Sequence, residues 1–174
     1  PSIALTSAVA GTTFSWTVVQ TGVSGATDAS GALIAQTLTA TGNVAGTAVY
    51  TITPSANGCP GAPISVTITV NPTPNVIATP ASQTICSASA PSIALTSAVA
   101  GTTFSWTVVQ TGVSGATDAS GALIAQTLTA TGNVAGTAVY TITPSANGCP
   151  GAPISVTITV NPTPNVIATP ASQT

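Results

Sequence analysis

The sequence contains no lysine, arginine or histidine, and its only acidic residues are Asp28 and Asp118. A typical soluble domain is about a quarter charged, whereas this chain is 1% charged. Without cations the protein has nothing to neutralise nucleic-acid phosphates or anionic lipid headgroups, so we expect neither as a partner. Without histidine, and with one carboxylate per repeat, no general-base or triad constellation is available. We therefore expect no catalysis, cofactor or metal, and we read Asp28 as a solvated loop residue.

Long hydrophobic runs are also missing. Thr, Gly or Ser interrupts every apolar stretch well before the roughly 18 residues that a membrane-spanning helix needs, so we expect no membrane insertion. With so little charge, the exposed faces must be covered mainly by Thr, Ser, Ala and Gly. Surfaces near zero net charge favour association, so we also expect lateral self-association.

What the sequence does contain is an internal repeat, because residues 1–84 recur unchanged as residues 91–174. A period of 90 residues is too long for a solenoid or a propeller blade and suits one small β-domain per repeat. The run NPTPNVIATPASQT follows the first copy at 71–84 and recurs at 161–174. We therefore expect the chain to be a window onto a longer periodic array.

The stretch from Gly46 to Val70, which recurs at 136–160, predicts a β-hairpin. Apolar residues alternate with Thr and Ser in its arms, a period of two that is typical of strands with one buried face. Asn57-Gly58 and several prolines provide the turn between the arms. Other extended runs precede the hairpin at 76–79, 84–86, 93–97, 104–109 and 123–130. About seven short strands per repeat predict an all-β fold of tandem immunoglobulin-like sandwiches.

The repeat also predicts the domain organisation. We expect an immunoglobulin-like repeat that lacks its first strand at 1–72, a complete repeat at 73–162, and the first strand of a following repeat at 163–174. The predicted inter-domain joint is a short segment stiffened by proline: Val70, Asn71, Pro72, Thr73 and Pro74.

The predicted core of each repeat is built around one tryptophan and one tyrosine. Trp16 and its copy Trp106 are expected at the core centre, while Tyr50 and its copy Tyr140 resemble a tyrosine that tethers the penultimate strand in many sandwiches. The remaining inward-facing residues of the complete repeat are expected to be Leu95, Phe104, Leu128, Ile142, Val156 and Ile158, with their copies 90 positions earlier.

Three cysteines are present, and Cys59 and Cys149 occupy the same position in the hairpin turn. Because no metal-binding residues accompany them, we predict disulfides in an oxidising, extracellular setting. We prefer a bond between Cys86 and Cys149 within one domain, with Cys59 paired to a cysteine outside these residues. In a standard sandwich, the position of Cys86 and the position of the turn cysteine lie at opposite ends of the domain. The alternative is therefore a disulfide between the adjoining ends of two successive domains.

The strings TFSWTV, GTAVYTITPSANGC and ISVTITVNPTP, together with ATPASQTIC, resemble a known family. They are similar to the PKD-like, immunoglobulin-like repeats of very large surface proteins from Bacteroidota-type bacteria, and the resemblance covers the whole chain. The resemblance implies secretion to the outside and a role in adhesins, stalks or filaments. It carries over no catalytic residue.

These features predict a non-catalytic structural repeat unit of an extracellular filament, stalk or giant adhesin, assembled end to end with identical neighbours. The alternative is a carbohydrate- or cell-binding adhesin module, although identical loops in both repeats favour a spacer. Two assembly routes are open: many repeats in one polypeptide, or donation of the 161–174 tail to the first domain of another chain. Of these we favour the covalent array.

Overall fold

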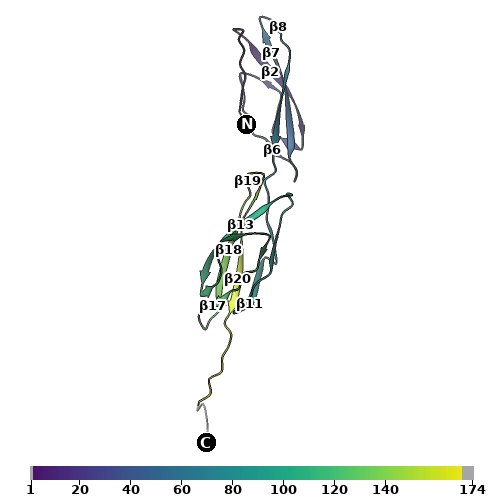
Figure 1. Ribbon diagram of the computed structural model, residues 1–174. Helices are drawn as coiled ribbons and strands as arrows, with labels where there is room; N and C mark the ends of the chain where they lie inside the picture. Colours follow the sequence, from purple (N-terminus) through teal and green to yellow (C-terminus); the bar gives the residue numbers. More distant parts are fainter. Residues whose placement is uncertain (1, 170–174) are drawn as a thin grey trace. The chain divides into compact units, whose positions relative to one another are not determined.

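A computed structural model describes residues 2–169 of the chain and divides it into two compact units (Figure 1). Unit 1 is Pro1–Thr73 with Ala98–Ala100, and unit 2 is Pro74–Ser97 with Gly101–Thr174. The main boundary therefore falls between Thr73 and Pro74, one residue beyond the predicted one. The described residues form strands and no helix, and accordingly no helix among them is long and apolar enough to cross a membrane.

Unit 2 is a β-sandwich with two main sheets and a short ribbon. The larger sheet has the order β11-β20-β18-β13-β15 with β19 paired to β18, the smaller sheet has the order β10-β12-β16, and β14 pairs with β17. Its strands are β10 (Ile77–Thr79), β11 (Ser82–Cys86), β12 (Ile93–Thr96), β13 (Thr103–Thr111), β14 (Val113–Ser114), β15 (Ala119–Ser120), β16 (Leu123–Ile124), β17 (Thr129–Ala130), β18 (Gly136–Ala146), β19 (Cys149–Pro150) and β20 (Ile154–Asn161).

Unit 1 contains the counterparts of β12 to β20, which are its strands β1 to β9 in the same order. Its larger sheet has the order β4-β2-β7-β8 with β9 paired to β7, and two-stranded sheets are formed by β1 with β5 and by β3 with β6. Its strands are β1 (Ile3–Ala4), β2 (Thr13–Thr21), β3 (Val23–Ser24), β4 (Ala29–Ser30), β5 (Leu33–Ile34), β6 (Thr39–Ala40), β7 (Gly46–Ala56), β8 (Cys59–Pro60) and β9 (Ile64–Val70). The predicted fold class, tandem all-β sandwiches of the immunoglobulin type, is confirmed.

The predicted hairpin forms in each unit, between β7 and β9 in unit 1 and between β18 and β20 in unit 2. In unit 2, β18 and β20 pair antiparallel from Gly136 opposite Val160 to Ile142 opposite Ile154. The turn that follows β18 places Asn147 at φ 50° and Gly148 at φ 77°. Two successive positive φ angles are the backbone of a type I′ turn, for which Asn-Gly is the preferred pair.

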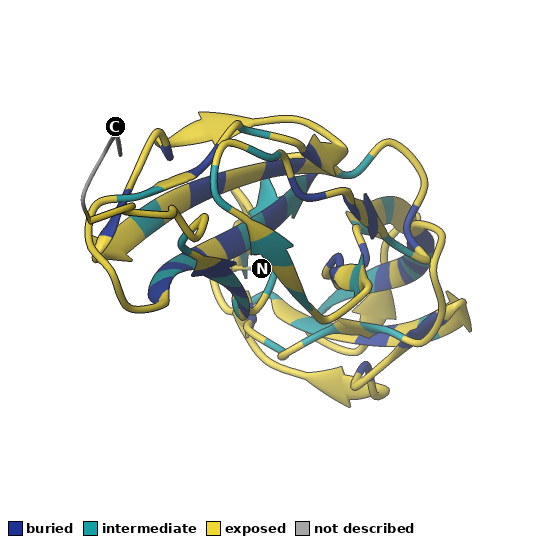
Figure 2. Cartoon of the chain, turned by 90° about the horizontal axis from the view of Figure 1, so that it is seen from below, coloured by how far each residue is buried: buried dark blue, intermediate teal, exposed yellow. Residues whose placement is uncertain are grey.

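Buried residues alternate with exposed ones along the strands, which gives the banded colouring in Figure 2. The core of unit 2 joins the inner faces of both sheets, from Leu95 and Ile124 on one to Trp106, Tyr140 and Ile158 on the other. All eight residues predicted for this core are buried. Of their eight predicted copies in unit 1, four are buried and four are only half-buried. The buried ones are Leu5, Trp16, Tyr50 and Ile52, and the half-buried ones are Phe14, Leu38, Val66 and Ile68.

One predicted strand is wrong. Residues 123–130 do not form a single strand but two short ones, and β16 pairs with β12 whereas β17 pairs with β14. Between them, Gln126 turns back to Thr117, and its Nε2 donates hydrogen bonds to the carbonyl oxygen and the hydroxyl of that residue at 2.9 and 2.8 Å. The segment thus crosses from one sheet to another, which an apolar pattern of this length does not reveal.

Candidate functional site

The two units differ by two strands, although they share one sequence. In unit 2, β12 pairs with β10 on one side and β16 on the other, and β20 pairs with both β18 and β11. In the described part of unit 1, their counterparts β1 and β9 each have one partner, β5 and β7 respectively. Unit 1 therefore carries two unpaired strand edges, which are surfaces that readily accept a further strand.

The missing strands also leave apolar side chains uncovered in unit 1. Val156, Ile158 and Val160 of β20 are buried, whereas the same three positions of β9 are only half-buried. Ile64, at the start of β9, is 58% exposed, while its copy Ile154 is half-buried. Strand β1 has two residues where β12 has four, as expected when a strand lacks a neighbour.

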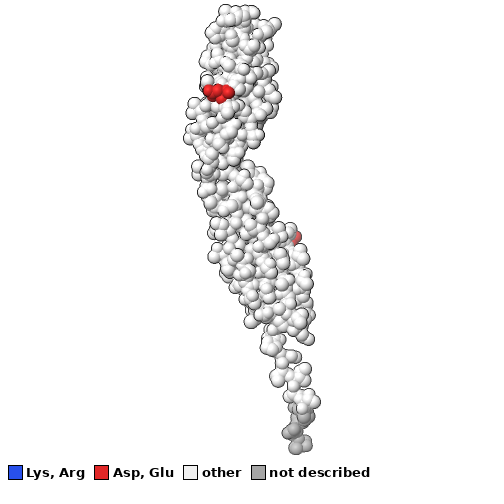
Figure 3. All heavy atoms as spheres, turned by 180° about the vertical axis from the view of Figure 1, so that it is seen from behind, with Lys and Arg blue, Asp and Glu red and all other residues white. Residues whose placement is uncertain are grey.

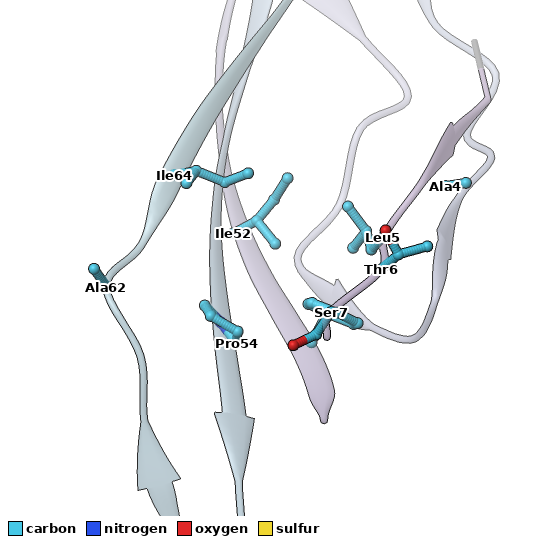
Figure 4. Close-up of a pocket in the computed structure, with 9 residues that line it drawn as sticks. Ala4, Leu5, Thr6, Ser7, Ile52, Pro54, Ala62 and Ile64 are labelled. Atoms are coloured by element: carbon cyan, nitrogen blue, oxygen red, sulfur yellow. The ribbon is translucent and has the colours of Figure 1, made fainter. Parts of the chain in front are cut away.

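A groove of about 370 Å³ lies between these two edges. Figure 4 shows Leu5 and Ser7 on one side and Ile52, Pro54 and Ile64 on the other. Its lining is mostly apolar, and it opens onto core residues of unit 1. The remaining residues that line it are Ala4, Thr6, Phe14 and Ala62.

In unit 2 the same place is filled by the chain that leads into β10. Pro74 is fully buried there and Val76 is 8% exposed. A Cβ atom on Gly151 would overlap the carbonyl oxygen of Pro74, so only glycine fits beneath that segment. At Gly61, the copy of Gly151 in unit 1, the nearest heavy atom to such a Cβ is Pro54 Cγ at 3.0 Å. The space above Gly61 is thus open where the space above Gly151 is occupied.

No charged side chain lines the groove. The face of the molecule in Figure 3 is almost entirely uncharged, in keeping with a sequence that holds two acids and no basic residue. Recognition in this groove must therefore rest on apolar burial and backbone hydrogen bonds rather than on ion pairs.

The two aspartates have a structural role that the sequence did not reveal. Asp28 Oδ1 accepts a hydrogen bond from the Val18 backbone N–H at 2.7 Å, and Asp118 accepts one from Val108 at 2.8 Å. Each carboxylate satisfies a backbone donor of β2 or β13 just beyond the short pairing with β4 or β15. Asp28 is thus a sheet-edge acceptor rather than only a solvated loop residue.

The predicted tethering tyrosines bind side chains of the segments that cross between sheets. The Tyr50 hydroxyl donates a hydrogen bond to Gln36 Oε1 at 2.8 Å, and Tyr140 donates one to Gln126 at 3.0 Å. Burial raises the pKa of both hydroxyls. Trp16 Nε1 donates to the carbonyl of Thr27 at 3.2 Å, whereas Trp106 Nε1 is buried without such a partner. These four residues organise the cores.

The three cysteines are free, and Cys59 and Cys86 are exposed. Cys86 lies opposite Asn161, at the end of the sheet where β18 begins, whereas Cys149 lies opposite Ala146, where β18 ends. The 11 residues of β18 separate these ends by roughly 33 Å at about 3.3 Å per residue, far beyond the roughly 7 Å that a disulfide allows. The prediction of a disulfide between Cys86 and Cys149 within one domain is therefore wrong. The bond between successive domains stays a prediction.

The predicted joint spans the unit boundary. Val70 ends β9 opposite Gly46, Asn71, Pro72 and Thr73 follow in unit 1 outside any strand, and Pro74 opens unit 2. Of the predicted strand 163–174, residues 163–169 form no strand, and 170–174 lie outside the described residues. Within residues 2–169, no three His, Cys, Asp or Glu side chains gather where they would hold a metal ion.

Comparison with known protein families matches the sequence of this chain to the PKD-like domain, over residues 2–74 and again over residues 83–164. The chain belongs to the PKD-like domain family. PKD-like domains are generally structural or adhesive modules, are commonly extracellular and are typically non-catalytic. A search of the curated proteins gave no match.

The groove of this PKD-like chain was not among the predicted site residues. Leu5, Gly61 and Ile64 carry no chemistry that marks a site, and their copies in unit 2 are ordinary packing residues. The sequence feature that indicates the groove is the order of segments within the repeat. Residues 74–84, which fill the corresponding groove of unit 2, come directly before the segment of β12, which is the second copy of the β1 segment.

Proposed function

We propose that this chain is a non-catalytic structural repeat unit of an extracellular filament, stalk or giant adhesin that assembles end to end with identical neighbours. The observation that carries the proposal is the exact repetition of one PKD-like domain with identical loops. A binding protein gains little from copying its loops unchanged, whereas a spacer needs only a stable unit and a joint.

The composition supports the same role. A surface without lysine or arginine offers no site to a trypsin-type protease, which is an advantage outside the cell. Large apolar side chains such as Val19 and Val44, with their copies Val109 and Val134, are exposed by 69–77%. On a surface of almost no charge, these residues favour lateral contacts between neighbouring assemblies.

The cysteines extend this proposal to the joints. A bond between the Cys86 position of one domain and the turn cysteine of a neighbouring domain would lock successive domains together. Peptide mapping of oxidised material, without reduction, tests it: the proposal requires Cys149 in a peptide linked to a Cys86-type peptide of another domain. Free thiols throughout native assemblies would remove this part of the proposal.

Electron microscopy of the native assembly tests the proposed function. We expect rods whose axial repeat matches one or two domains. Compact single particles at working concentration would contradict the proposal. Binding of this chain alone to a glycan array would instead favour the carbohydrate- or cell-binding adhesin role.

A further inference from the structure

We propose that the groove of unit 1 binds residues 164–174 of a second copy of this chain, which enter it as an added strand. The proposal rests on and deepens the end-to-end assembly proposed above, since it names the surface and the segment that meet. It takes the second assembly route, donation of the tail, in place of the covalent array that the sequence favoured. Residues 164–174 have the same sequence as residues 74–84, and those residues fill the corresponding groove of unit 2. The occupant and the groove are therefore already matched to each other within this structure.

The register of the added strand follows from unit 2. There, Ile77, Ala78 and Thr79 of β10 lie opposite Thr96, Leu95 and Ala94 of β12. The repeat places a copy of each β10 residue 90 positions later and a copy of each β12 residue 90 positions earlier. The same pairing then sets the incoming residues opposite β1 and the residues that follow it: Ile167 opposite Thr6, Ala168 opposite Leu5, and Thr169 opposite Ala4. The last incoming residues then run parallel to β9, as β11 runs parallel to β20. Both unpaired edges of unit 1 gain their partner from one segment.

The apolar anchor of this strand is Val166. In unit 2 its copy Val76 is 8% exposed and belongs to the core, whereas Val166 is 92% exposed. Ile167 is 81% exposed, but its copy Ile77 remains 51% exposed even when paired. Docking therefore buries Val166 and leaves its neighbour largely in solvent, which provides a matched pair of test positions.

A polar contact and a close approach fix the same placement. In unit 2 the Ser97 hydroxyl donates a hydrogen bond to Asn75 Oδ1 at 3.0 Å. The copies of these residues are Ser7, which lines the groove, and Asn165 of the incoming strand. In the empty groove a Cβ on Gly61 would meet only Pro54 closely, at 3.0 Å from its Cγ, so a small shift of that side chain accommodates it. With Pro164 seated as Pro74 is seated, the Cβ would instead strike the Pro164 carbonyl oxygen.

Such contacts join different surfaces of identical chains. A tail that enters the groove of the next chain leaves that chain's own tail free, so the interaction continues without closing. Backbone pairing supplies affinity, and the pocket for Val166 supplies register. The prolines of the tail restrict it before binding and so reduce the entropy lost on docking.

The test uses the 174-residue chain and its variants in sedimentation velocity over a concentration series. Val166→Asp places a carboxylate in the apolar pocket, and we expect it to raise the dissociation constant at least about 100-fold, leaving monomers. Ile167→Asp adds the same charge one residue later and is expected to stay within a few-fold of the unmodified chain. If Val166→Asp assembles as the unmodified chain does, the proposal is wrong.

The groove is tested with Gly61→Ala, and with Ile64→Asp as a second variant should the first fail to fold. Each is expected to be folded by circular dichroism and monomeric. Mixing Val166→Asp with either groove variant must then give a one-to-one dimer and nothing longer, because one intact tail meets one intact groove. Monomers in that mixture would overturn the proposal, and so would an unmodified chain that stays monomeric at every concentration by occupying its own groove.

The same samples separate this inference from the proposed function. Filaments that persist in both Val166→Asp and Gly61→Ala would refute strand addition while leaving the structural role intact. Dimers in the mixture, with no filaments from the unmodified chain under electron microscopy, would support the groove and refute the filament.

Discussion

Because the two units share a sequence but not their covering strands, one substitution made in each measures what the missing strands contribute. Ile158 of β20 is fully buried, and its copy Ile68 of β9 is half-buried. Truncating a buried isoleucine to alanine costs about 2–5 kcal/mol through lost transfer free energy and the cavity left behind. We expect Ile158→Ala to lower the free energy of unfolding of unit 2 by about 4 kcal/mol, and Ile68→Ala to lower that of unit 1 by about half as much.

The assay is urea unfolding followed by tryptophan fluorescence, with free energies extrapolated linearly to water. Replacing Trp16 by Phe leaves Trp106 to report on unit 2, and the converse replacement reports on unit 1. The Val166→Asp background and low protein concentration keep the groove of unit 1 empty. Equal losses in the two units under these conditions would refute the reasoning, because they would mean that β9 is as well covered as β20.

Three further expectations concern the buried tyrosines, the aspartate that accepts a backbone hydrogen bond, and the cysteines. Burial raises the pKa of Tyr50 and Tyr140 above the ordinary value of 10.0. Their contribution to stability is therefore complete below about pH 10 and is lost as pH rises through the folded-state pKa. A tyrosinate absorbance titration of the folded chain with its midpoint at or below the ordinary value would contradict this. Asp118→Ala removes the acceptor for the Val108 N–H and is expected to cost about 1 kcal/mol in urea unfolding, whereas Asp118→Asn, which keeps an oxygen acceptor, should cost less; equal losses would argue against the hydrogen bond. Thiol titration of the freshly reduced, undenatured chain should find at least the two exposed cysteines reactive, and a chain whose thiols react only after denaturation would contradict their placement.

The sequence predicted most of what is local in this fold. Alternation along 46–70 indicated the hairpin, Asn57-Gly58 indicated its turn, and the inward set around Trp106 and Tyr140 is the core of unit 2. These features depend on neighbours in sequence and on which face a residue occupies, and a period of two reports both.

What the sequence did not predict depends on which strands meet. The switch between sheets within 123–130 rests on Gln126, whose side chain binds Thr117 across a loop. The position of Cys86 at the far end of the sheet from Cys149 follows from the parallel pairing of β11 with β20. Pairing partners far apart in sequence leave no periodic signal, so these features required the structure.

The most direct test of strand addition is a disulfide trap at the expected register. In a background with the three native cysteines replaced by Ser, Ala4→Cys and Thr169→Cys place thiols at positions expected to lie opposite each other, and both side chains are exposed. Oxidation should link chains into a ladder of multiples on a non-reducing gel. Ala4→Cys with Ile167→Cys, two residues out of register at about 7–8 Å, should link far less. A ladder of equal strength from both pairs, or monomers alone from the in-register pair, would contradict the account.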